Sequence, residues 1–125
     1  MSLSHLLAVG AGGFIGAIAR YAMSTALNAL TPRFPLGTLG VNVLGAFLLG
    51  LLATLFLEKV SVGVELRLLL LVGVLGAFTT FSTFSLETLD LIRAGSWPAA
   101  CLSMVANLGG TLIAVWAGVA LAKLW

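Results

Sequence analysis

The sequence predicts an all-α membrane protein in which four transmembrane helices form a single domain over residues 1–125. Hydrophobic residues make up 61% of the chain and charged residues only 8%, whereas a soluble domain has about 25% charged residues. A short chain has much surface for its volume, and six cations and four anions are too few to cover that surface in water. Four apolar stretches, each long enough for the ~20 residues that cross a bilayer, supply the helices.

The first two apolar stretches are residues 6–30 and 37–57. The first ends at the turn Thr31-Pro32-Arg33-Phe34-Pro35, where two prolines stop a helix. Ala17-Ile18-Ala19 also fits the small-x-small pattern of a signal-peptide cleavage site. No Lys or Arg precedes this stretch, and it stays apolar beyond Ala19, which favours a membrane span. The second stretch ends at Glu58-Lys59.

The other two stretches are residues 66–92 and 97–122. The third ends at Arg93-Ala94-Gly95-Ser96. Trp97 and Trp125 bracket the fourth, at the interfacial depth that amphipathic aromatic rings prefer. The pattern therefore predicts a multi-pass membrane protein.

The same composition excludes several classes of function. Cys101 and His5 are the only cysteine and histidine, so neither an intrachain disulfide nor a metal site built from cysteines and histidines can form. The net charge is only +2 and the cations are dispersed from Arg20 to Lys123, so we expect no nucleic-acid partner. No nucleophile–base pair is available, so we expect no enzyme.

The distribution of cations predicts dual topology. Four spans place both termini and the second connection on one side of the membrane. The cations on that side are Lys59, Arg67 and Lys123, and those on the other are Arg33, Arg93 and, if it is counted, Arg20. Because the counts are nearly equal, the positive-inside rule favours neither orientation. Two copies in opposite orientation form an antiparallel homodimer with inverted-repeat geometry; a parallel dimer or larger ring is the alternative.

Glycines at helical spacing indicate close contact between helices. Gly12 and Gly16 form a G-x-x-x-G pair in the first stretch. The glycines of the second stretch are Gly37, Gly40, Gly45 and Gly50. Small residues let helix backbones approach in lipid, where no hydrophobic force drives them together. Glycine is also common in membrane helices generally, so the role of any single position stays open.

A hydroxyl-rich run predicts that the third helix is broken near its centre. Thr79, Thr80, Ser82, Thr83 and Ser85 follow Gly76 within an otherwise leucine-rich stretch. Side-chain hydroxyls can replace lost backbone hydrogen bonds, so a helix can break here without leaving unpaired groups in lipid. A broken helix at mid-membrane is a common form of ion site. An unbroken helix, with each hydroxyl bonded to its own i−4 carbonyl, is the alternative.

Two phenylalanines and one amide suggest an anion pathway beside this run. Phe81 and Phe84 share a helix face, and the positive edge of an aromatic ring can meet a small anion without holding it tightly. Plain packing is the alternative for this pair. Asn42, in the second stretch, brings an amide to membrane depth, where a polar group needs a partner or a polar pathway.

Three segments together resemble the Fluc (CrcB) fluoride channels of microorganisms. They are Gly12-Gly13-x-x-Gly16-Ala17-x-x-Arg20-Tyr21, Gly37-Thr38-Leu39-x-Val41-Asn42-x-x-Gly45 and Gly76-x-x-Thr79-Thr80-Phe81-Ser82-Thr83-Phe84-Ser85-x-Glu87. The chain length and the four spans also match this family. Its members are described as dual-topology antiparallel dimers that export fluoride passively through two pores. The resemblance thus implies a passive, fluoride-selective channel of the cytoplasmic (inner) membrane, with fluoride, lipid and a second copy as partners.

The resemblance also implies roles for individual residues. Phe81 and Phe84 correspond to the pore phenylalanines, with Asn42 as the amide beside them and Ser82 within the same motif. Family members hold a structural Na⁺ on the two-fold axis through backbone carbonyls at the helix break. The corresponding residues here are Gly76 and Thr79, and two copies would supply four such oxygens, which suit a hard cation.

The fourth span departs from the family pattern. Members often have a Tyr followed four residues later by a Ser, which form a polar track with a threonine of the second span, here Thr38. In this chain Ser103 and Asn107 have the matching spacing, so a hydroxyl–amide pair is expected in the track.

Two charged residues of the motif segments have more than one interpretation. Arg20 either extends to the headgroups or makes a vestibule electropositive for anions, and the family motif favours the vestibule. Glu87, near the end of the third span, is expected at the interface or paired with a cation such as Arg20.

Asp90 and Arg93 are expected to form a helix-end pair.

A small proton-coupled exporter of cationic compounds is the competing function, because such proteins can also have four helices and dual topology. Proton exchange requires a carboxylate buried at mid-membrane. The first two spans carry none before Glu58, and Glu87 lies toward a helix end. A purely structural subunit would leave Asn42 and the hydroxyl run without a role.

Overall fold

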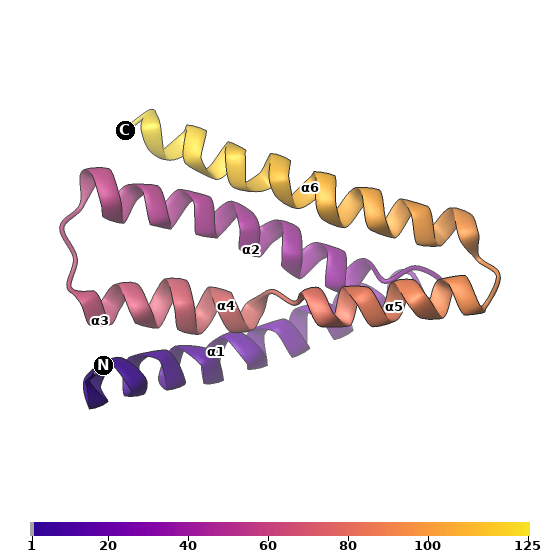
Figure 1. The fold of residues 1–125 in the computed structure, drawn as a ribbon, viewed down its shortest axis with the longest axis horizontal. Helices are drawn as coiled ribbons and strands as arrows, with labels where there is room; N and C mark the ends of the chain where they lie inside the picture. The colour runs from indigo at the N-terminus through magenta and orange to yellow at the C-terminus, as the bar shows by residue number, and fades with distance from the viewer. Residues whose placement is uncertain (1) are drawn as a thin grey trace.

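Every regular element is a helix in the computed structural model, which describes residues 2–125 (Figure 1). The elements in chain order are α1 (Leu3–Asn28), α2 (Leu36–Thr54), η1 (Leu55–Lys59), α3 (Val64–Arg67), η2 (Leu68–Val74), α4 (Leu75–Phe78), α5 (Phe81–Arg93) and α6 (Trp97–Lys123). The segments η1 and η2 are π-helical turns that continue their neighbouring α-helices. The sequence pattern carries no sign of either π-helical segment.

Four helical segments are long and apolar enough to cross a membrane: Leu3–Asn28, Leu36–Lys59, Val64–Arg93 and Trp97–Lys123. The first begins three residues before the expected stretch because Ser2 caps it, its side-chain oxygen accepting the His5 N–H at 3.3 Å. The other three begin or end within two residues of the expected stretches. The chain is therefore an all-α, multi-pass membrane protein.

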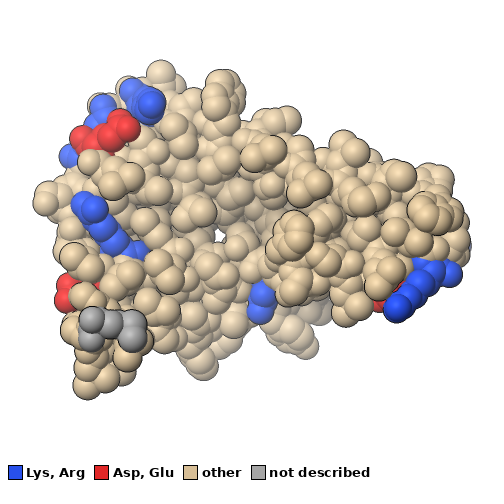
Figure 2. Space-filling model, viewed as in Figure 1, with Lys and Arg blue, Asp and Glu red and all other residues tan. Residues whose placement is uncertain are grey.

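The four spans run antiparallel along the long axis of the molecule. Both termini and the connection between η1 and α3 lie at one end, and the α1–α2 and α5–α6 connections lie at the other (Figure 1). The Lys, Arg, Asp and Glu side chains that Figure 2 shows gather toward these two ends, with a single cationic side chain between them. The middle of this face thus carries little charge over the depth that lipid tails occupy.

Short polar contacts fasten the connections. The Arg67 guanidinium donates from Nη2 to the Phe56 carbonyl oxygen at 2.6 Å. A side chain at the start of the third span thus caps a free carbonyl at the end of the second span. At the other end, Gly95 adopts a left-handed φ of 75°, which suits glycine, and the chain turns sharply between α5 and α6. Pro98 then lies in the first turn of α6, where its missing N–H costs nothing.

Glycines set the closest approach between spans. The most extensive packing joins α2 and α6, and a Cβ added to Gly50 or Gly118 would overlap a backbone carbonyl oxygen of the opposite helix, at Val115 and Phe47 respectively. The first and third spans also approach closely at glycines. A Cβ added to Gly12 or Gly16 of α1 would overlap a backbone carbonyl oxygen of η2, at Leu69 and Val74 respectively. The predicted role of glycine in helix contact is therefore confirmed at these positions.

The third span is interrupted at Thr79 and Thr80. Both residues have extended backbone, with φ and ψ of −87° and 158° at Thr79 and −154° and 117° at Thr80. The Thr79 N–H and hydroxyl both donate to the Leu75 carbonyl oxygen, at 3.1 and 3.0 Å, and end α4. Thr80 then caps α5, its hydroxyl oxygen accepting the Thr83 N–H at 3.2 Å. The predicted break is present, and the alternative of an unbroken helix is wrong.

Substituting Gly118 by Ala should destabilise the protein, because the new methyl group would overlap the Phe47 carbonyl and force α2 and α6 apart. Overpacking of this kind costs about 1–3 kcal/mol. The melting temperature of the purified protein in detergent measures the effect. The matched control is Gly109→Ala in the same helix, where an added Cβ meets nothing within 4 Å. If both variants melt at the wild-type temperature, the α2–α6 approach does not depend on Gly118.

Candidate functional site

The extended residue at the break is held by a side chain of α2. Asn42 accepts the Thr80 N–H on its Oδ1 at 2.8 Å and donates from Nδ2 to the Thr80 carbonyl oxygen at 3.0 Å. Asn42 is 8% exposed and Thr80 is 9% exposed, so neither residue can rely on solvent. The side-chain amide thus satisfies both backbone groups of Thr80, as a neighbouring strand would.

In the described part of the chain, the break leaves four backbone carbonyls without their helical donors, those of Gly76, Ala77, Phe78 and Thr79. In an uninterrupted α-helix the N–H groups of Thr80 and Thr83 would donate to the carbonyls of Gly76 and Thr79. Here those N–H groups donate to Asn42 and to the Thr80 hydroxyl instead. Within residues 2–125, the carbonyl oxygens of Gly76 and Thr79 therefore lack their helical donors. Gly76 lies on the exposed surface of the chain and Thr79 is half-buried.

A chain of buried polar groups continues from the break into α6 and α5. The Asn42 Nδ2 also donates to the Asn107 Oδ1 at 3.0 Å, and the Asn107 Nδ2 donates to the Ser103 carbonyl oxygen at 3.0 Å. The hydroxyls of Ser103 and Thr88 lie 3.4 Å apart. All four side chains belong to buried residues. Polar groups from three helices are thereby joined inside an apolar bundle.

The two phenylalanines lie beside this chain. Their ring centroids are 5.3 Å apart with an interplanar angle of 67°, so they meet edge to face. Phe84 is 6% exposed, whereas Phe81 is 68% exposed. Both line a cavity of about 250 Å³, together with Asn42, Asn107 and Thr111.

A second cavity lies on the other side of the break. Its volume is about 220 Å³, and its polar lining residues are Arg20, Tyr21, Ser24, Thr38, Thr80 and Thr83. Thr38 is only 3% exposed. Thr80 lines both cavities, and the other extended residue of the break, Thr79, lines only the phenylalanine cavity. Among the described residues, Thr80 is the one lining residue that the two cavities share.

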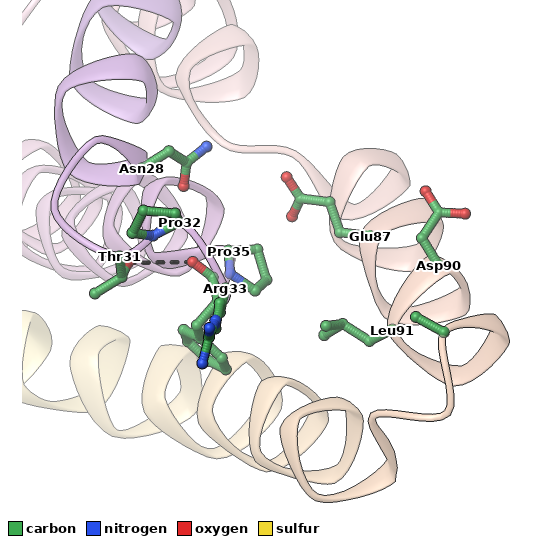
Figure 3. A pocket seen from close by; sticks show the side chains of 10 residues that line it. Asn28, Thr31, Pro32, Arg33, Pro35, Glu87, Asp90 and Leu91 are labelled. Atoms are coloured by element: carbon green, nitrogen blue, oxygen red, sulfur yellow. Dashed lines mark hydrogen bonds between the residues drawn. The ribbon is translucent and has the colours of Figure 1, made fainter.

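A third cavity, of about 370 Å³, opens at the end of the molecule where α1 and α2 are joined. Figure 3 shows Glu87 and Asp90 of α5 on one side of it and Asn28 with the connecting loop on the other. Among residues 2–125 the close contacts between acidic and basic side chains are His5–Glu65 and Asp90–Arg93. The Asp90–Arg93 pair is confirmed, and of the two alternatives for Glu87 the pairing with Arg20 is wrong. Glu87 and Arg20 line different cavities.

The predicted site residues fall into five groups. Phe81, Phe84, Asn42 and Asn107 share one cavity, and Thr38 and Arg20 share the other. Ser103 lies behind Asn107 in the buried polar chain and lines neither of them. Ser82 is exposed, and its hydroxyl lies 3.4 Å from that of Thr80. Gly76 lies within α4, and Thr79 follows α4 directly at the break and also lines the phenylalanine cavity.

The sequence analysis missed the roles of three residues of this region. They are Thr80, which lines both cavities, Thr88 of the buried polar chain, and Thr111 of the phenylalanine cavity. The signal for two of them was helical spacing. Thr88 follows Phe84 by four residues and Thr111 follows Asn107 by four residues, so each shares a face with a predicted site residue. The hydroxyl of Thr111 donates to the Asn107 carbonyl oxygen at 2.6 Å.

The chain is similar to a well-defined set of proteins. Residues 7–119 match the family model described as CrcB-like protein, Camphor Resistance (CrcB). The fluoride-specific ion channel FluC of Magnetococcus marinus is 50% identical over 117 residues, which cover 93% of this chain and 95% of that protein. The protein of the same name from Rhizobium meliloti is 43% identical over 122 residues, covering 97% and 98%. That from Chlorobaculum tepidum is 43% identical over 125 residues, covering 100% and 99%.

The relatives match the whole architecture rather than one motif, since the aligned residues include all four spans together with the break and both cavities beside it. With a family model that spans most of its length and relatives of this identity, the chain belongs to the CrcB-like family.

Proposed function

We propose that this chain is a passive, fluoride-selective ion channel that exports fluoride across the cytoplasmic membrane. The observation that carries this conclusion is the pair of cavities on either side of Thr80, lined by polar groups and phenylalanines at the centre of the bundle. The names of the relatives, fluoride-specific ion channels, supply the ion. No chemistry is required of the protein beyond a polar path, so it is not an enzyme.

The cavity linings suit a small anion that must lose its water. Arg20 gives the first cavity a positive charge, which concentrates anions, and Thr38 and Thr83 bring hydroxyls to the same cavity. In the second cavity, the ring edges of Phe81 and Phe84 and the amide of Asn107 offer weak positive contacts. Weak contacts in series favour conduction, because an ion must leave each site as well as enter it.

We propose that the working form is an antiparallel homodimer with two pores. Phe81 is 68% exposed, and Ser82 and Ser85, which follow the break in α5, are exposed as well, although they lie at membrane depth. Hydroxyls facing hydrocarbon are costly, so a second copy covers this surface better than lipid does. The cations are divided almost equally between the two ends of the molecule, which permits opposite insertion. A two-fold axis then repeats each cavity once per copy.

A structural Na⁺ at the dimer axis fits the released carbonyls. The oxygens of Gly76 and Thr79 lack helical donors, and an exposed Gly76 leaves room for an approaching second copy. Carbonyl oxygens are hard ligands that suit a hard cation. When bound, the ion supplies positive charge that satisfies carbonyls from both copies, and we propose that it is part of the architecture and is not transported.

The competing function, proton-coupled export of cationic compounds, requires a carboxylate at mid-membrane. Glu87 lines the cavity at the end of the molecule, beside Asp90 and the α1–α2 connection. Efflux from liposomes separates the two functions: a channel releases fluoride without a proton gradient and excludes chloride, whereas an exporter moves a protonated drug cation.

Replacing Phe84 by Ile should lower fluoride efflux from proteoliposomes at least tenfold, because the aliphatic side chain has no positive ring edge for the ion. A fluoride electrode measures the efflux, and Phe81→Ile should act in the same direction. Phe14→Ile is the matched control, since Phe14 is 70% exposed on α1 and lines neither cavity. Wild-type efflux from a well-folded Phe84→Ile dimer would mean that this ring is only packing.

Cysteine labelling should find each connection on both faces of the membrane in comparable amounts. Single cysteines flanking Arg33 and Lys59, in a Cys101→Ser background because Cys101 is exposed, report the two ends. Adding two or three Lys residues near Lys59 should bias insertion and reduce activity. Co-expression with an oppositely biased variant should restore activity. A single uniform orientation of the wild-type chain would contradict dual topology.

Replacing Na⁺ by N-methyl-D-glucamine should lower the melting temperature of the dimer and abolish efflux, because that cation is too large for a carbonyl cage. Melting curves and efflux are measured in both salts. A fluoride flux that scales with the Na⁺ gradient would mean that Na⁺ is a coupled substrate, and the structural assignment would then be wrong.

A further inference from the structure

The amide of Asn42 has no hydrogen left for a passing ion. A neutral carboxamide carries two N–H hydrogens, and the Nδ2 of Asn42 donates to the Thr80 carbonyl oxygen and to the Asn107 Oδ1, both at 3.0 Å. The Oδ1 is occupied by the Thr80 N–H at 2.8 Å. By contrast, the Nδ2 of Asn107 has one protein acceptor among residues 2–125, the Ser103 carbonyl oxygen, and one hydrogen to spare at the cavity. Asn107, rather than Asn42, therefore holds the free donor.

The contacts of Asn42 act on the backbone of the third span instead. If the side chain were absent, the buried N–H of Thr80 would need another acceptor, since an unpaired buried group costs about 1–3 kcal/mol. The acceptor that an α-helix offers to Thr80 is the Gly76 carbonyl oxygen. Closing that bond would restore a helical turn and occupy the Gly76 carbonyl, which the break leaves free.

We infer that Asn42 is a positioning residue for the cation site: by accepting the Thr80 N–H it keeps the Gly76 carbonyl free to bind the ion, beside the Thr79 carbonyl that the Thr80 cap releases. This inference rests on the structural Na⁺ of the proposed function. Asn42 lines the cavity beside Phe84 and also forms hydrogen bonds to the backbone of Thr80 at the break. In this inference, one side chain therefore connects the fluoride pathway with the cation site at the dimer axis. Outer residues that orient metal ligands change metal affinity by about 10–100-fold when substituted.

The experiment measures how the melting temperature of the purified dimer rises with Na⁺ concentration, at constant ionic strength maintained with N-methyl-D-glucamine. For Asn42→Ala, the Na⁺ concentration that gives half of the rise should increase at least tenfold. Asn42→Asp keeps the size of the side chain and an acceptor for the Thr80 N–H but loses both donated bonds, so a smaller increase is expected. This second variant carries the test if Asn42→Ala does not fold.

Phe84→Ile is the control, because Phe84 lines the same cavity and makes no hydrogen bond to the break. It should lose fluoride efflux and keep the wild-type Na⁺ midpoint. If the Asn42 variants lose efflux but also keep that midpoint, Asn42 belongs to the pore alone and the inference is overturned. If the wild-type protein shows no Na⁺-dependent rise at all, the structural Na⁺ fails together with the inference, while fluoride efflux still tests the channel itself.

Discussion

The pairing of Asn42 with the backbone of Thr80 is the interaction on which the site depends. In lipid, every backbone N–H and carbonyl must find a partner within the protein. A residue of extended backbone at the centre of a span is stable here because the amide of α2 supplies the missing donor and acceptor. The same pairing diverts the Thr80 N–H from Gly76, and the cap formed by the Thr80 hydroxyl diverts the Thr83 N–H from Thr79.

The close approach of the helices brings these groups together. Glycines at positions 50 and 118 allow α2 and α6 to meet backbone to backbone, which places Asn107 within 3.0 Å of Asn42. A Cβ added to Gly45 would overlap the Thr79 side chain, so α2 also lies directly against the break. Small residues thus determine not only the stability of the bundle but the distance between polar groups on different spans.

The polar groups have different roles according to what already occupies them. Asn42 has every hydrogen-bonding group engaged, whereas Asn107 retains an N–H hydrogen and Phe81 is largely uncovered. A side chain whose hydrogen-bonding groups are all occupied, such as Asn42, holds the backbone in place. A side chain with a free N–H hydrogen or an uncovered ring can contact an ion or a second copy of the chain. This distinction explains why residues of similar chemistry, all at membrane depth, are placed in separate parts of the proposed mechanism.

The sequence by itself determined the four spans, the break in the third and the shared helix face of Phe81 and Phe84, because hydrophobic length, turn residues and helical spacing are local properties. The tertiary structure alone decided which partner each polar group takes. It separated Ser82 and Ser103 from the cavities, moved Glu87 away from Arg20 and added Thr80, Thr88 and Thr111. The physical reason is that a hydrogen bond between two spans depends on their rotation and separation, which arise from backbone contacts at glycines far apart in the chain.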